Sequence, residues 1–100
     1  MIETSRATLD EAVKRFAGSW DLDDVQVDGQ GLLYLPVEEF GNAIEFIGHL
    51  AVATLNEQDV AHVDVDDTLK RVADISDGAR LAEGPWGGQC LKLPNLRVEV

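Results

Sequence analysis

Basic side chains are scarce in this sequence, and from residue 16 to residue 69 they are absent. That segment contains twelve Asp and Glu residues and no lysine or arginine, whereas the segments on either side are close to neutral. It therefore carries the whole net charge of −11. Proteins bind nucleic-acid phosphates mainly through Lys and Arg side chains. We therefore expect no direct binding to nucleic acid.

Cysteine and long hydrophobic runs are also scarce. The single Cys90 excludes an internal disulfide, which fits a reducing cytoplasm. The longest apolar stretch, residues 43–55, is interrupted by Glu45 and His49, and it is shorter than the ~18–20 residues that cross a bilayer. The first residues do not show the basic and then apolar pattern of a secretory signal. We therefore expect a cytoplasmic chain without a membrane partner, with residues 1–100 forming one domain.

The sequence does contain one long amphipathic stretch, from Pro36 to Asn56. Pro36 suits the first position of a helix, where a missing N–H leaves no hydrogen bond unmade. Apolar residues then recur at helical spacing. The predicted buried stripe is Val37, Phe40, Ala43, Ile44, Ile47, Ala51 and Leu55, and the predicted exposed face is Glu38, Asn42, Glu45 and His49.

Shorter elements are predicted on both sides of this helix. Thr8 and Glu11 have the spacing of a capping box and predict a first helix that begins at Thr8. A short helix through Ile75 is predicted to be capped by Asp66 or Asp67. The predicted strands are 25–27, 32–35, 60–66, 79–83, 89–93 and 96–100. A hairpin turn is predicted at Asp28-Gly29-Gln30-Gly31, and loops are predicted at 84–88 and at Pro94-Asn95. This order predicts an α+β domain, in which an antiparallel or mixed sheet of about five strands packs against one long central helix and two shorter helices.

Residues 60–69, VAHVDVDDTL, are the one stretch with a chemical interpretation. They are similar to the first motif of the haloacid dehalogenase-like phosphohydrolases, an apolar strand followed by D-x-D-x-T-L. The resemblance implies that Asp64 is a phosphoryl-accepting nucleophile, that Asp66 is the acid/base, and that both help to hold magnesium in a parallel doubly wound fold. Only thirty-one residues follow Leu69, whereas each further βαβ unit needs roughly 30. His62 also stands where that family usually has an apolar residue.

The acids of this stretch have a second chemical interpretation. His62, Asp64 and Asp66 would share one face of the predicted strand and offer ligands to a loosely held divalent cation, as in a small metal-dependent or ligand-binding regulatory domain. A calcium loop is excluded, since Leu69 stands at the sixth position, where the loop needs glycine. We favour the simpler interpretation, a strand with an acidic face followed by a helix cap. It predicts no metal, no cofactor, no catalytic residue and no enzyme activity.

The placement of the acids favours a protein-binding function. Opposite charges on two surfaces raise the rate at which they associate. In size and charge the chain resembles small acidic inhibitors of nucleases, such as immunity proteins and phage proteins that block CRISPR or restriction complexes. We expect a non-enzymatic inhibitor that mimics nucleic acid and docks on the basic, nucleic-acid-binding surface of a partner such as a nuclease. The predicted contact residues are Asp21, Asp23, Asp24, Asp28, Glu57, Asp59, Asp64, Asp66, Asp67 and Trp86.

Two alternatives stay open at this stage. Trp86, in the Gly-rich loop 84–88, either closes the hydrophobic core or anchors a contact with a partner. The last strand, residues 96–100, offers an edge through which two copies of the chain would pair as a homodimer.

Overall fold

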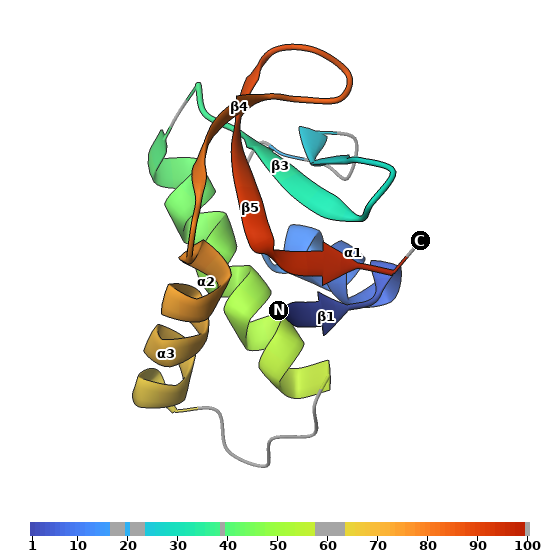
Figure 1. The fold of residues 1–100 in the computed structure, drawn as a ribbon. Helices are drawn as coiled ribbons and strands as arrows, with labels where there is room; N and C mark the ends of the chain where they lie inside the picture. Colours follow the sequence, from blue (N-terminus) through green and yellow to red (C-terminus); the bar gives the residue numbers. More distant parts are fainter. Residues whose placement is uncertain (17–19, 21–23, 39, 58–63, 100) are drawn as a thin grey trace.

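The chain folds into a five-stranded sheet with three helices packed on one of its faces, as a computed structural model shows (Figure 1). The structure describes residues 1–16, 20, 24–38, 40–57 and 64–99. The elements are β1 (Ile2–Thr4), α1 (Arg6–Arg15), β2 (Gln26–Val27), β3 (Leu32–Pro36), α2 (Phe40–Glu57), α3 (Val65–Ser76), β4 (Arg80–Glu83) and β5 (Gln89–Val98). The predicted α+β class, with a mixed sheet of five strands and one long helix, is confirmed.

Strand β5 is the centre of the sheet. It pairs with β3 in antiparallel orientation along one side, and β2 extends the sheet beyond β3. Along its other side, the first half of β5 pairs with β4 in antiparallel orientation and the second half pairs with β1 in parallel orientation. Because β5 is ten residues long, it has room for two short partners on the same side.

The predicted turn at Pro94-Asn95 is wrong, because both residues lie within β5. The pairing of β5 with β3 is irregular there: Leu33 lies opposite Leu93, but the preceding Leu32 lies opposite Arg97. This bulge accommodates a proline that has no N–H to give to the sheet.

The end of β5 also corrects the expected dimer contact. Residues 96–98 pair with β1 on one side, and Arg97 pairs with Leu32 of β3 on the other. The predicted strand 96–100 is therefore not a free edge over these residues. Two copies therefore cannot pair through residues 96–98 as a free edge, and the formation of a homodimer itself stays a prediction.

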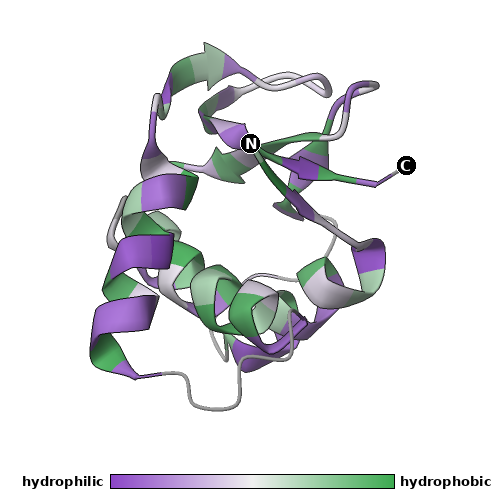
Figure 2. Ribbon diagram, turned by 60° about the horizontal axis from the view of Figure 1, so that its bottom comes forward, coloured by the Kyte–Doolittle hydropathy of each residue, from purple (hydrophilic) through white to green (hydrophobic). Residues whose placement is uncertain are grey.

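Helix α2 lies at the middle of the hydrophobic core, as predicted, and Ala43, Ile47, Ala51 and Leu55 of the predicted stripe are buried, but the buried face is wider than predicted. Phe46 and Leu50 are fully buried, whereas Ile44, expected inside, is 54% exposed. The cause is that α1 and α3 pack against α2 on either side, in addition to the sheet. The ring of Phe46 lies 6.0 Å from that of Phe16 after α1. Figure 2 shows α2 as hydrophobic along most of its length.

The first helix begins two residues earlier than expected. Ser5 is its N-cap, and its side-chain oxygen accepts a hydrogen bond from the backbone N–H of Thr8 at 3.1 Å. The predicted cap, Thr8, is instead buried in the first turn of α1. The sequence offers a hydroxyl at both positions, and the capping box with Glu11 pointed to the wrong one.

The long helix begins four residues later than expected. Pro36 is the last residue of β3, where it lies opposite Cys90 of β5, and α2 begins at Phe40. Pro36 is therefore not the first residue of the helix. Pairing with β5, which is distant in the sequence, holds the proline in the sheet.

The predicted strand 60–66 is wrong over its described part. Residues 60–63 lie outside the described residues, but Asp64 is the N-cap of α3 and Val65 is its first residue. Asp64 Oδ1 accepts a hydrogen bond from the Asp67 N–H at 2.8 Å, so the cap is Asp64 and not Asp66 or Asp67. Period-two alternation over such a short stretch does not distinguish a strand from the entry to a helix.

Candidate protein-interaction surface

Asp28, one of the predicted contact residues, organises the turn between β2 and β3. Its Oδ1 accepts hydrogen bonds from the N–H groups of Gln30 at 2.9 Å and Leu32 at 3.0 Å. Its Oδ2 accepts a hydrogen bond from the hydroxyl of Tyr34 at 2.9 Å. Both carboxylate oxygens are therefore used within the chain. The structure gives Asp28 a role in the hairpin, and a contact between Asp28 and a partner stays a prediction.

These hydrogen bonds also set the ionisation of both side chains. Partial burial of the Asp28 carboxyl raises its pKa, but the hydrogen bonds from Leu32, Tyr34 and Gln30 outweigh that effect, so the pKa lies below its usual value. The pKa of Tyr34 is raised, first by burial and then by its hydrogen bond to Asp28. The carboxylate is the form of Asp28 that the folded hairpin stabilises.

The Asp28→Asn variant is expected to lower the free energy of unfolding by about 1–3 kcal/mol near neutral pH, because an amide cannot replace all of these charge-assisted hydrogen bonds. The folded-state pKa of Asp28 is lowered. Its contribution is therefore present above the unfolded-state pKa of about 3.9 and is lost as the pH falls through the folded-state pKa. Urea unfolding at a series of pH values measures this difference.

The exposed Glu83→Gln variant is the control, and its stability should follow that of the wild type at every pH. A difference between wild type and Asp28→Asn that stays constant down to acid pH would contradict the role given to the carboxylate.

Trp86 lies in the loop between β4 and β5, which is the hairpin loop that the sequence predicted. Its side chain is 65% exposed, so it does not close the core. The loop is held from β2: Gln26 Oε1 accepts from the Trp86 N–H at 2.8 Å, and Gln26 Nε2 donates to the Gly87 carbonyl at 3.2 Å. In Figure 1 this loop is at the opposite end of the molecule from the start of α3. Trp86 therefore belongs to a different surface from the acids of α3.

Four of the predicted acids lie at the end of α2 and at the start of α3, which are both at the same end of the molecule in Figure 1. Glu57 is exposed on the last turn of α2, and its Oε2 accepts a hydrogen bond from the Thr4 hydroxyl at 2.8 Å. Asp64 caps α3, and Asp66 and Asp67 lie in its first turn, where negative charge is favoured by the helix dipole. We call these four residues, Glu57, Asp64, Asp66 and Asp67, the acidic end.

Large apolar side chains lie beside these acids, and the sequence did not indicate their exposure. Val65 is 73% exposed and Leu69 is 61% exposed, one helical turn apart on α3. Together with Val52 of α2 and with Asp64 and Thr68 they line a groove of about 290 Å³ between the two helices. Only the packing of α3 shows that Val65 and Leu69 face solvent.

The remaining predicted contact residues do not join the acidic end. Asp24 is exposed just before β2, in a different part of the fold. Asp21, Asp23 and Asp59 lie outside the described residues.

The alternative chemical interpretation is not supported by the position of its residues. His62 lies outside the described residues, and Asp64 and Asp66 lie at the start of a helix instead of on one face of a strand. The parallel doubly wound fold that the phosphohydrolase resemblance implies is not the fold of this chain. Within the described part of the chain, no three His, Cys, Asp or Glu side chains lie close enough together to hold a metal ion.

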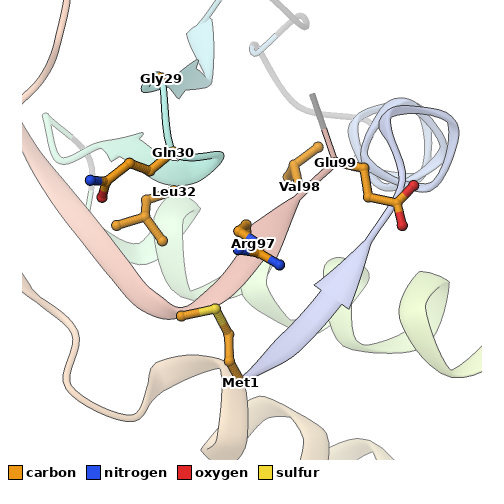
Figure 3. Close-up of a pocket in the computed structure, with 7 residues that line it drawn as sticks. All are labelled: Met1, Gly29, Gln30, Leu32, Arg97, Val98 and Glu99. Carbon is orange, nitrogen blue, oxygen red and sulfur yellow. The ribbon is translucent and has the colours of Figure 1, made fainter.

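A hollow of about 760 Å³, larger than the groove between α2 and α3, opens at the face of the sheet opposite the helices (Figure 3). Met1, Leu32 and Arg97 line it from three neighbouring segments, with Gln30 and Glu99 at its sides. Arg97, which lines it from β5, forms an ion pair with Glu3.

Comparisons with protein-family models, with curated protein sequences and with solved structures give no match to this chain. Over the residues that the structure describes, every helix is too short or too polar to cross a membrane.

Proposed function

We propose that this chain is a non-enzymatic protein-binding module that docks through its acidic end on a basic surface of a partner protein. One observation carries the proposal: the acids around the first turn of α3 lie beside exposed apolar side chains, Val65 and Leu69. A solvated acidic face needs no large apolar residues. Their combination with charge is typical of a surface that is covered on binding.

The charge supports a basic partner. Residues 64–69 contain three acids and no lysine or arginine, and the segment without basic residues extends back to residue 16. Such a field accelerates encounter with a positively charged surface and repels acidic ones. Nucleic-acid-binding grooves, including those of nucleases, are strongly basic protein surfaces. An inhibitor of such a cytoplasmic protein, of the immunity or anti-CRISPR kind, is the role that fits this charge.

The Asp66→Asn/Asp67→Asn double variant is expected to bind a cationic polypeptide more weakly than the wild type does. Oligolysine is a suitable probe, and isothermal titration at several salt concentrations gives the dissociation constant. Loss of two surface charge contacts should raise this constant about 3- to 10-fold at low salt, and the difference should shrink as salt rises. Asp64 is left unchanged because it caps α3.

The Glu83→Gln/Glu99→Gln double variant is the matched control. It removes the same two negative charges from exposed positions outside the acidic end. If the control loses as much affinity as the test variant, binding depends on net charge alone, which contradicts a local docking surface. Absence of binding by the wild type would also contradict the proposal.

A further inference from the structure

Helix α3 carries a wide apolar face of which the beginning is uncovered. Ile75, near the end of the helix, is fully buried against the rest of the core, and Val72 packs on that core. Val65 and Leu69 belong to the adjoining part of the same face but remain mostly exposed. In Figure 1, α2 and α3 diverge toward the start of α3. Among the described residues, this divergence leaves Val65 and Leu69 mostly uncovered on that side.

The groove that results has apolar walls on both sides. Val52 of α2 faces Val65 and Leu69 of α3 across it, and Thr68 and Asp64 complete the lining. Val65 and Leu69 are four residues apart on one helix, so they are separated by about 6 Å along its axis. Side chains that repeat every helical turn on a partner would match this spacing.

The charges at the groove select the occupant. Asp64 lines the groove, and Asp66 and Asp67 lie on the same first turn of α3. Lys70 is the nearest cation along α3. It is exposed and directly follows Leu69. The groove is thus an apolar strip that is negatively charged at the end where α3 begins. A second copy of this chain, with its net charge of −11, would be repelled.

We infer that the groove between α2 and α3 binds a basic amphipathic helix of the partner protein, an inference that rests on the proposed function. Apolar side chains on one face of that helix lie against Val52, Val65 and Leu69. Lys or Arg side chains that flank this face reach Asp64, which lines the groove, and Asp66 beside it on the first turn. This mode of recognition uses apolar anchors at i, i+3, i+4 and i+7, and the opposite charges fix the orientation of the bound helix along the groove.

The test compares two synthetic peptides of the same composition and charge. One places leucines along one face of a helix with lysines beside them, and the other has the same residues in an order without such a face. The wild-type chain is expected to bind the amphipathic peptide at least about tenfold more tightly than the scrambled one. The Val65→Thr/Leu69→Gln variant is expected to lose this preference while it still binds the scrambled peptide.

The control is Leu81→Gln, which changes an exposed leucine on β4 and should keep the full preference. Equal binding of both peptides by the wild type would contradict the binding of an amphipathic helix in the groove, but it would leave the proposal of an acidic docking surface intact. Failure to bind either peptide would overturn both. A wild type that sediments as a dimer and becomes a monomer in the Val65→Thr/Leu69→Gln variant would show that a second copy fills the groove, which also overturns the inference.

Discussion

The Gly31→Ala variant is expected to lower the free energy of unfolding by about 2–4 kcal/mol, although it adds only one methyl group. Gly31 has a φ of 86°, and a left-handed conformation costs about 1–2 kcal/mol for a residue with a side chain. A Cβ atom at this position would also lie 2.2 Å from the Val98 carbonyl oxygen. The β2–β3 turn therefore cannot keep its place against β5 once the methyl group is present.

The close approach has a structural purpose. The Val98 N–H donates to the Gly31 carbonyl at 2.8 Å, so the turn is joined to the end of β5. A shift of the turn would break this hydrogen bond and disturb the neighbouring pair of Leu32 and Arg97. Urea unfolding followed by circular dichroism measures the loss.

Gly29→Ala provides the comparison within the same turn. Nothing lies within 4 Å of a Cβ at Gly29, and its φ is not in the left-handed region. We expect it to change the stability by less than about 0.5 kcal/mol. Equal losses in the two variants would mean that glycine flexibility, and not the approach to β5, determines the effect.

The Phe46→Ala variant is expected to cost about 3–5 kcal/mol, as large-to-small substitutions of buried aromatic residues do. Phe46 has no exposed surface, and its ring contacts those of Phe16 and Trp20 with centroids 6.0 and 5.4 Å away. Removal of the ring leaves a cavity between α1 and α2 that rigid neighbours cannot fill. Because a domain of this size is stable by about 5–15 kcal/mol, a large share of its stability would be lost.

Ile44→Ala is the matched change on the same helix, two residues away. Ile44 is 54% exposed, so we expect a loss below about 1 kcal/mol. Denaturant midpoints of the two variants, at unchanged slope, give the comparison. The periodicity of the sequence predicts the opposite order, with Ile44 inside. If Ile44→Ala proves the more costly, α2 is rotated relative to the structure described above.

The sequence was sufficient for the elements that local signals define. Turn chemistry at Asp28-Gly29-Gln30-Gly31 and at Gly84–Gly88 located both hairpins, since glycine and aspartate favour turns whatever surrounds them. The long apolar repeat located α2, and the α+β class followed from the order of elements. The concentration of charge at residues 16–69 is likewise a property of the sequence alone.

Tertiary structure decided what depends on residues far apart in the chain. β1, which the sequence analysis missed, is three residues long and exists through its parallel pairing with residues 96–98 of β5. The same pairing removes the free edge expected at the end of the chain. Pro36 likewise lies in the sheet because β3 pairs with β5, where Cys90 is opposite the proline. No local pattern encodes a partner that is 54 or 94 residues away, as Cys90 is from Pro36 and Leu96 is from Ile2.

The candidate surface also depends partly on the sequence alone and partly on the tertiary structure. The sequence determined which residues are acidic, but the tertiary structure decided that Asp28 is used within the β2–β3 hairpin and that the loop with Trp86 lies far from the start of α3. It also decided that Val65 and Leu69 are exposed, because α3 leaves α2 before its apolar face is covered. Amphipathic periodicity gives the direction of an apolar face, whereas the extent of its burial depends on how closely the neighbouring helix follows it.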